Sequence, residues 1–206
     1  MTGAHGVATA LKEWAVCEAA LASGRTIVLL RKGGIREPAR AFRIERAAFA
    51  LYPTYEHQRA DLLAPDFAAL LPATLADAPP PGTVRVRLWL EVTDAYEVTD
   101  AEHLAALAPF HMWTAAYAEE RLRWRPKQPL LVMLVRAYHL AAPLVLPYEA
   151  RYGGCTSWVE LAVPPDQTGR VPVLDAAAYA ALAAPVRAAL AGLPAATIDA
   201  GLHAAR

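Results

Sequence analysis

The sequence predicts an α+β domain with a mixed, mostly antiparallel sheet, packing helices and a small C-terminal helical cap. Three observations predict this class. Short apolar, β-branched runs alternate irregularly with helical segments along the chain. Residues 83–93 alternate strictly between apolar and other side chains, as half-buried strands do. Residues 175–190 are rich in alanine and begin at an aspartate, which is typical of a capped helix. We expect residues 1–165 to form the main domain and residues 166–206 a helical extension packed on it.

The first half of the chain has two predicted strands, a loosely helical segment and a proline-rich loop, at residues 26–30, 42–51, 61–75 and 78–82. The first strand runs into Gly33-Gly34, which signals a turn. The second is expected to end at Pro53, because proline has no amide hydrogen for a sheet. Residues 7–22 fit either an alanine-rich helix or a strand from Trp14 to Ala20, and the apolar period does not separate the two.

The second half has three predicted strands, at residues 83–93, 129–138 and 157–163. Residues 99–102 fit a capping box, in which a hydroxyl and a carboxylate accept hydrogen bonds from the first amides of a helix. A second helix from about Pro109 towards Arg121 would carry its aromatic side chains on one face. Asp175 is expected to cap the last helix, which Gly192 ends.

Composition and charge exclude several classes of protein. Twenty basic residues balance twenty acidic ones, so attraction to nucleic acid would have to come from a local patch. Charges interrupt every apolar run before the roughly 18 residues that a membrane-spanning helix needs, so we expect no membrane partner. The two cysteines are too few for a disulfide framework and fit a reducing compartment, which predicts a cytoplasmic location.

A basic segment surrounds the diglycine turn. Residues 25–46 contain seven basic and two acidic residues. Glycine amides approach a phosphate closely, and the guanidinium fork matches phosphate oxygens. We therefore predict a phosphate-binding loop built from Arg31, Lys32, Gly33, Gly34 and Arg36. The alternative is a plain hairpin with a solvated basic rim, since such turns are common between strands.

A second basic block contains Arg121, Arg123, Trp124, Arg125 and Lys127. An aromatic ring among arginines can stack on a base while its neighbours bind phosphates, so Arg123, Trp124 and Arg125 are candidate ligand contacts. In the alternative, Trp124 belongs to the core and the arginines form the solvated end of a helix. Residues 91–102 are acidic in compensation, and this separation of charge would suit contact between parts of the fold or between two copies in a homodimer.

Four hydrogen-bonding side chains, Tyr55, Glu56, His57 and Gln58, follow the second predicted strand. Loops on a rigid scaffold are common places for binding sites. His57 could act as a general base or donate to a phosphate, with Glu56 setting its charge state. Tyr55 and Gln58 are further candidate ligand contacts. The alternative is a capping network that holds the loop in place.

Cys155 lies in a predicted turn after Gly154. As a nucleophile it would need a lowered pKa and a nearby base, for which His57, His111 and His139 are candidates. With Glu56 and His57 it would form the site of a hydrolase or transferase. A small buried thiol is the commoner situation. No pair of cysteines or histidines has the spacing of a zinc site, and we expect neither a metal nor a cofactor.

Four motifs occur in order: Lys12-Glu13-Trp14-Ala15, Leu29-Leu30-Arg31-Lys32-Gly33-Gly34-Ile35, Tyr52-Pro53-Thr54-Tyr55-Glu56-His57-Gln58 and Tyr152-Gly153-Gly154-Cys155-Thr156-Ser157-Trp158. Together they resemble a bacterial family, domain of unknown function 1802, over roughly residues 9–165. Some relatives accompany a restriction-endonuclease domain of the Mrr type, which implies work on DNA. Such nucleases place a lysine two residues after a metal-binding acid, whereas no lysine here follows an acid at that spacing. The resemblance therefore implies binding or accessory work rather than cleavage.

These observations lead to one main hypothesis and two alternatives. We predict a module that binds DNA, RNA or a phosphate-bearing small molecule, accessory to restriction-modification or other DNA processing. An enzyme using Glu56, His57 and Cys155 is the first alternative. The second is an interaction scaffold in which all the polar motifs are structural.

Overall fold

The structure, a computed structural model, describes residues 8–32 and 43–198. In this part of the chain the strands are β1 (Ala8–Trp14), β2 (Val28–Arg31), β3 (Ala48–Thr54), β4 (Thr83–Val98), β5 (Leu130–Pro147), β6 (Trp158–Leu161) and β7 (Val171–Pro172). The helices are α1 (Ala15–Ala22), α2 (Pro65–Ala68), α3 (Leu71–Ala76), α4 (Ala101–Ala106), α5 (Ala115–Arg123) and α6 (Ala176–Ala189), with 3₁₀ turns η2 (Ala60–Leu62) and η3 (Ala150–Tyr152). Gly33, Gly34 and Arg36 of the predicted phosphate loop lie outside the described residues.

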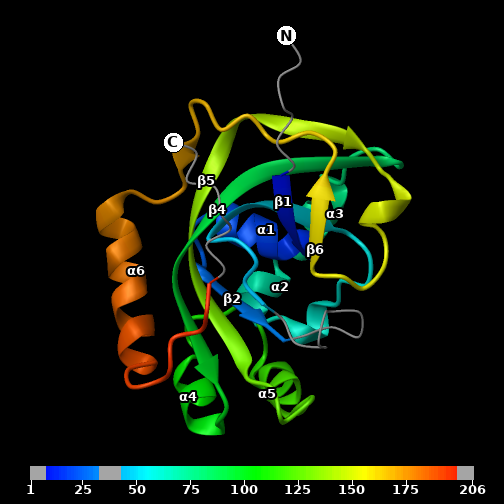
Figure 1. The fold of residues 1–206 in the computed structure, drawn as a ribbon. Coiled ribbons are helices and arrows are strands. Elements are labelled where there is room, and N and C mark those ends of the chain that lie inside the picture. Colours follow the sequence, from blue (N-terminus) through cyan, green and yellow to red (C-terminus); the bar gives the residue numbers. More distant parts are fainter. Residues whose placement is uncertain (1–7, 33–42, 199–206) are drawn as a thin grey trace.

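The described strands form one curled sheet in the order β2-β5-β4-β3-β1-β6, and β7 pairs with β5. β1 and β3 run parallel, and the other pairs are antiparallel. Figure 1 shows the long strands β4 and β5 curving through the molecule, with α4 and α5 at their lower end. The predicted α+β class is confirmed.

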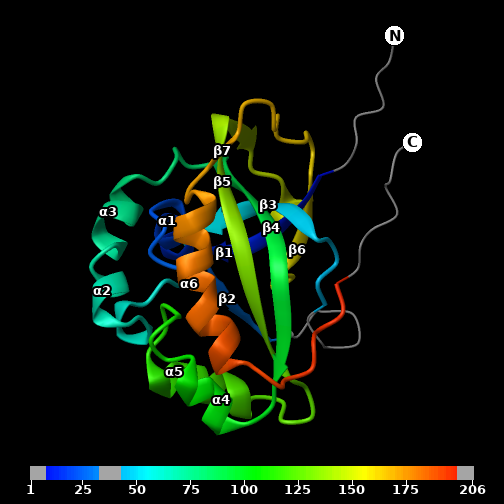
Figure 2. The ribbon, with the colours of Figure 1, turned by 90° about the vertical axis from the view of Figure 1, so that its left-hand side faces the viewer.

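The first third of β5 is buried on both faces, because its side chains alternate between two cores. Leu131 and Met133 pack in a core that includes side chains of α1, α2 and α3. Leu130 and Val132 pack in a second core with α4, α5 and α6. In Figure 2, α2 and α3 lie to one side of the sheet and α6 crosses in front of it. This double burial explains why the segment reads as a continuous apolar run.

Two of the expected elements in the first half are wrong in their limits. Residues 7–22 are neither one helix nor a strand from Trp14, because β1 ends at Trp14 and α1 begins at Ala15. The second strand lies at 48–54 and contains Pro53, which is paired with Glu13 of β1. Burial of Phe49 and Leu51 in the core outweighs one missing amide donor near the end of a strand.

β4 and β5 both extend beyond their predicted ends. Val86 pairs with Leu144 and Leu88 with His139, so β5 has extra residues in this register shift. Pro143 lies within the irregular stretch, where a residue without an amide hydrogen is tolerated. The segment between Pro143 and Pro147 is therefore part of β5.

Two predicted helix starts are found. The Asp100 carboxylate accepts a hydrogen bond from the His103 amide at 2.9 Å, and the Asp175 carboxylate accepts one from the Ala178 amide at 2.8 Å. Asp100 thus caps α4, in place of a hydroxyl cap at residue 99. Thr114 caps α5, so the helix begins later than expected from Pro109.

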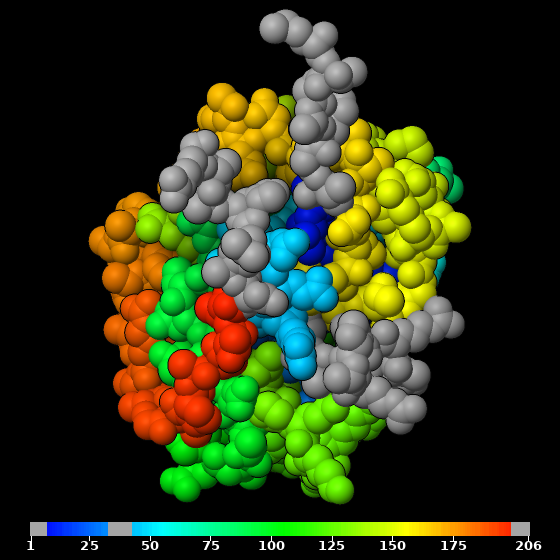
Figure 3. All heavy atoms as spheres, viewed as in Figure 1, coloured from blue at the N-terminus to red at the C-terminus, as the bar shows by residue number. Residues whose placement is uncertain are grey.

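Residues beyond 165 add β7 and α6 to the sheet and its second core. Two ion pairs attach them to β4: Arg170 to Glu91 at 2.6 Å, and Arg187 to Asp94 at 2.7 Å. The acidic stretch thus holds the C-terminal part of the fold in place. Figure 3 shows the end of the described chain, in red, against the cyan segment that begins at residue 43. No helix in the described ranges has the length and apolar character to cross a membrane.

Candidate functional site

A cavity of about 310 Å³, here called the first hollow, lies where β1, β2 and β3 end. β1 and β3 are parallel, with Trp14 paired to Thr54, so their carboxyl ends meet at one edge of the sheet. Each of the four sequence motifs contributes to its lining, through Lys12, Arg31, His57 and Gly154. Segments far apart in the sequence therefore converge on one site.

Arg31 ties three of these segments together. Its guanidinium donates to the Glu13 carboxylate at 2.9 Å and to the Ser157 hydroxyl at 2.7 Å, and it also contacts the Lys12 carbonyl at 3.3 Å. The Glu13 side chain is only 7% exposed, so the ion pair is largely desolvated. Arg31 lines the hollow, but part of its donor capacity already serves the fold.

Lys12 forms the boundary of the hollow beside Gly154. Its ammonium donates to the carbonyl oxygens of Tyr152 at 2.7 Å and Gly154 at 2.8 Å. Burial lowers the pKa of Lys12, and the nearby Cys155 and Glu56 act in the opposite direction. An ammonium has three N–H donors, so two backbone contacts leave one for a ligand.

Glu56 and His57 are exposed and both line the first hollow. His57 has a φ of 61°, in the left-handed region that non-glycine residues seldom adopt. Residues in such strained conformations gather at functional sites, and this one lines the cavity.

Cys155 is exposed and directly follows Gly154, although it does not itself line the hollow. Of its three candidate bases, only His57 lies at this site. His111 is buried, and its Nδ1 accepts a hydrogen bond from the Trp113 amide at 3.2 Å. His139 Nε2 lies 3.1 Å from the carbonyl of Ala22. A Cys155 reaction assisted by a base would therefore depend on His57.

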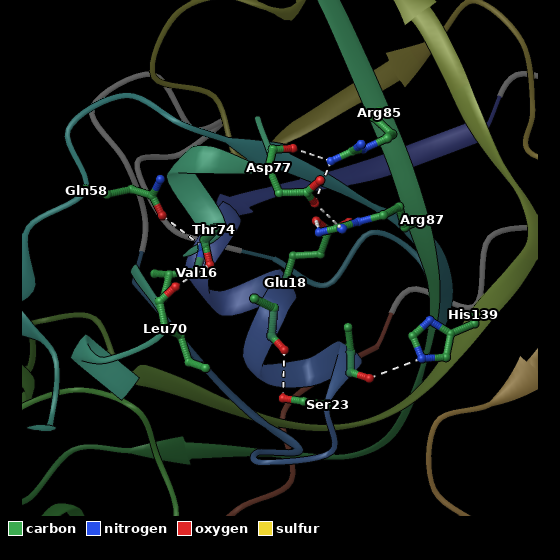
Figure 4. Close-up of polar contacts among 12 residues, drawn as sticks. Val16, Glu18, Ser23, Gln58, Leu70, Thr74, Asp77, Arg85, Arg87 and His139 are labelled. Carbon is green, nitrogen blue, oxygen red and sulfur yellow. Dashed lines mark hydrogen bonds and ion pairs between the residues drawn. The ribbon is translucent and has the colours of Figure 1, made fainter. Parts of the chain in front are cut away.

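Gln58 has a structural contact. Its side-chain oxygen accepts a hydrogen bond from the Val16 amide at 2.9 Å and so caps the first turn of α1 (Figure 4). The capping alternative considered for this loop therefore holds for Gln58. Tyr55 instead lines a second cavity, and burial raises its pKa.

Of Lys32 and the second basic block, only Arg121 lines the first hollow. Lys32 is 3% exposed and donates to the Leu122 carbonyl at 2.6 Å, which keeps its ammonium away from the cavity. Burial and the neighbouring Arg121 lower the pKa of Lys32. Arg121 itself lines the hollow.

The other candidates of this block do not line it. The Arg123 side chain is 74% exposed and lies 3.8 Å from Glu119 in an ion pair. The Trp124 ring centroid is 5.0 Å from the guanidinium carbon of Arg121 and 4.5 Å from that of Arg125. A base that stacked on Trp124 would therefore compete with two cation–π contacts.

The second hollow, about 330 Å³, adjoins the first. The two cavities share the lining residues Lys12, Thr54, Glu56 and Gly154. Beyond that boundary the second is lined mainly by tyrosines and prolines: Tyr52, Tyr55, Tyr148, Tyr152, Pro79, Pro80 and Pro81. The site is thus a pair of neighbouring cavities, one charged and tryptophan-lined, the other tyrosine-lined.

A buried ion pair supports the sheet beside these cavities. The Glu18 side chain is 0% exposed and accepts from Arg87 at 2.7 Å, and Arg87 also contacts Asp77 at 2.8 Å (Figure 4). Burial raises the pKa of Glu18, against the opposing effect of Arg87. Hydrogen bonding to Arg85, followed by its charge and that of Arg87, lowers the pKa of Asp77.

Sequence reasoning gave no role to several lining residues: Lys12, Glu13, Trp14, Trp113, Tyr117 and Arg121. Lys12, Glu13 and Trp14 belong to the first of the four motifs, but that motif alone indicated no role for their side chains. Trp113 and Tyr117 belong to the aromatic face predicted after Pro109, and although largely buried they line the hollow. Among the described residues no three His, Cys, Asp or Glu side chains form a group that could hold a metal ion.

Comparison with known proteins identifies a family. The family model described as domain of unknown function (DUF1802) matches residues 10–185. No curated protein and no solved structure matches the chain.

Proposed function

We propose that this chain, which belongs to the DUF1802 family, binds a phosphate-bearing ligand of the nucleotide type in the first hollow. The proposal is based on the geometry of the site. The observation that carries the proposal is the convergence of cationic and aromatic side chains from distant segments on one cavity of about 310 Å³. Cavities of this size are typical of small-ligand sites. A DNA-processing role would place the end of a nucleic acid strand in the same hollow.

The charges of the hollow favour an anion. Lys12, Arg31 and Arg121 line it together with Glu13 and Glu56. Glu13 is neutralised by Arg31 at 2.9 Å, which leaves two cations facing a single exposed carboxylate. A phosphate between Lys12 and Arg121 would receive charge-assisted hydrogen bonds.

The aromatic side chains form a wall suited to a base. The ring centroids of Trp14 and Trp113 are 5.2 Å apart, and those of Trp113 and Tyr117 are 4.8 Å apart. Each of the three rings lines the hollow. Stacking of a base on such rings contributes about 1–3 kcal/mol and tolerates any base.

Calorimetric titration with AMP tests the proposal, with Arg121→Gln as the test variant and Arg123→Gln as its matched control. Both substitutions remove one charge from α5, but only Arg121 lines the hollow. Loss of a hydrogen bond to a charged group costs about 1.5–3 kcal/mol, so we expect at least about a tenfold rise in Kd for Arg121→Gln. The control should stay within about twofold of wild type. Absence of AMP binding, or equal effects of the two variants, would refute the proposal.

A hydrolase or transferase is the second candidate function. It is favoured by the placement of Glu56 and His57 at the same hollow as the turn that holds Cys155. If His57 activates the thiol, iodoacetamide should alkylate Cys155 rapidly at neutral pH and more slowly in His57→Ala. Buried Cys17 serves as the internal control. An alkylation rate that does not change in His57→Ala would exclude this role.

A further inference from the structure

We infer that the two hollows together hold a ligand with two nucleosides joined through phosphate, one base in each hollow and the phosphate beside Lys12. This inference rests on the proposed function, because it assumes that the first hollow receives a nucleotide. It adds a second aromatic subsite and assigns it to the second hollow.

The two cavities are continuous, so one ligand can occupy both. The first hollow, about 310 Å³, and the second, about 330 Å³, share Lys12, Thr54, Glu56 and Gly154 in their linings. A ligand that filled both would therefore pass directly beside the Lys12 ammonium. In such a ligand the phosphate lies between two bases. In the protein Lys12 likewise lies between the tyrosine-lined and the tryptophan-lined cavity.

The side chains of the second hollow suit the binding of a second base. Tyr148 is a large ring that is 51% exposed and also lines the cavity. Its amide donates to the Gly82 carbonyl at 2.7 Å, so its backbone is fixed. The three consecutive prolines of the same cavity have no amide hydrogens, so they provide apolar surface without backbone donors. A cavity lined by an exposed tyrosine and by apolar proline rings suits the stacking of a flat ring.

Gly153 gives the turn the space that this arrangement needs. A Cβ at this position would lie 2.8 Å from the Tyr148 hydroxyl oxygen and 3.1 Å from the Ala150 carbonyl. The turn that presents the Gly154 carbonyl to Lys12 therefore also lets the Tyr148 hydroxyl approach closely. A substitution at Gly153 would displace one or the other.

The test compares AMP with the dinucleotide pApA, by calorimetry, on wild type and Tyr148→Ala. Stacking of a second base predicts that wild type binds pApA about tenfold tighter than AMP. Tyr148→Ala should remove this gain and leave the Kd for AMP unchanged, because Tyr148 does not line the first hollow. Tyr148→Phe should keep the gain. Val171→Ala, a change at a similarly exposed apolar side chain of β7, is the control.

The outcomes separate this inference from the proposed function. If AMP binds and pApA binds no tighter, or if Tyr148→Ala weakens AMP and pApA equally, the second subsite is refuted while the first stands. If AMP does not bind, the proposed function itself fails. A ten-nucleotide adenine strand distinguishes the source of the ligand, since equal affinity for the strand and pApA indicates a free dinucleotide and tighter binding of the strand indicates an oligonucleotide end.

Discussion

Glu18 is a carboxylate with no exposed surface in the middle of α1, paired with Arg87 at 2.7 Å. Because burial is the largest influence on it, its pKa is raised above the ordinary value of 4.5. The folded protein therefore keeps this proton to a higher pH than the unfolded chain does. From the unfolded pKa up to the folded pKa, the free energy of unfolding contributed by Glu18 falls as pH rises.

Glu18→Gln isolates this effect, because the amide keeps the shape of the neutral carboxyl group and does not titrate. Urea unfolding of both proteins from pH 4 to 8 should show wild type losing stability relative to the variant as pH rises through this window. Glu160→Gln, an exposed change on β6, is the control and should give a flat difference. If the difference in free energy of unfolding between wild type and Glu18→Gln does not change with pH, or changes in favour of wild type as pH rises, the pKa of Glu18 is not raised.

The helix α6 shows how one local contact holds an element of the fold. Asp175 caps its first turn through the Ala178 amide at 2.8 Å, and Tyr179 and Val186 pack in the second core. Asp175→Ala removes the cap and should lower the free energy of unfolding by about 1 kcal/mol. Asp175→Asn keeps an acceptor oxygen and should cost less. Thermal unfolding of the three proteins measures this, and equal melting temperatures would show that packing alone fixes the helix.

Elements whose signals are local were predictable from the sequence. The cap at Asp175 and the approximate start of α4 depend on residues within one helical turn, although α4 is capped by Asp100 and not by the expected hydroxyl at residue 99. The strand at residues 83–93 shows its own alternation. The change from strand to helix after Trp14 was not predictable, because the apolar period of residues 7–22 fits either structure. Residues 15–22 form a helix whose first turn is capped by Gln58, 42 positions away in the sequence.

The candidate site was predictable only in part, because the positions of several of its residues depend on contacts between distant segments. The motif residues His57 and Arg31, which the sequence analysis treats in separate loops, line one cavity. Lys12 and Arg121 were missed as ligand contacts because their positions depend on pairing across the sheet and on α5. Lys32 has the same charge as its neighbour Arg31 in the sequence, yet the fold buries one and turns the other towards the cavity.

The whole molecule is electrically neutral, with 20 basic and 20 acidic residues, and many of its charges are used in internal ion pairs. Attraction to a nucleic acid backbone therefore has to come from a local group of cations. If it binds a single strand, the contacts should be confined to the few cations of the first hollow. The salt dependence of binding measures their number directly.

Two phosphate contacts, through Lys12 and Arg121, predict a slope of about −1.4 in a plot of log K against log salt concentration for a single strand. Fluorescence anisotropy of a labelled ten-nucleotide strand between about 50 and 200 mM salt gives this slope. Arg121→Gln should reduce its magnitude by about 0.7, and Arg123→Gln should leave it unchanged. A slope steeper than about −3 would require an extended basic surface and would contradict a binding site confined to the hollow.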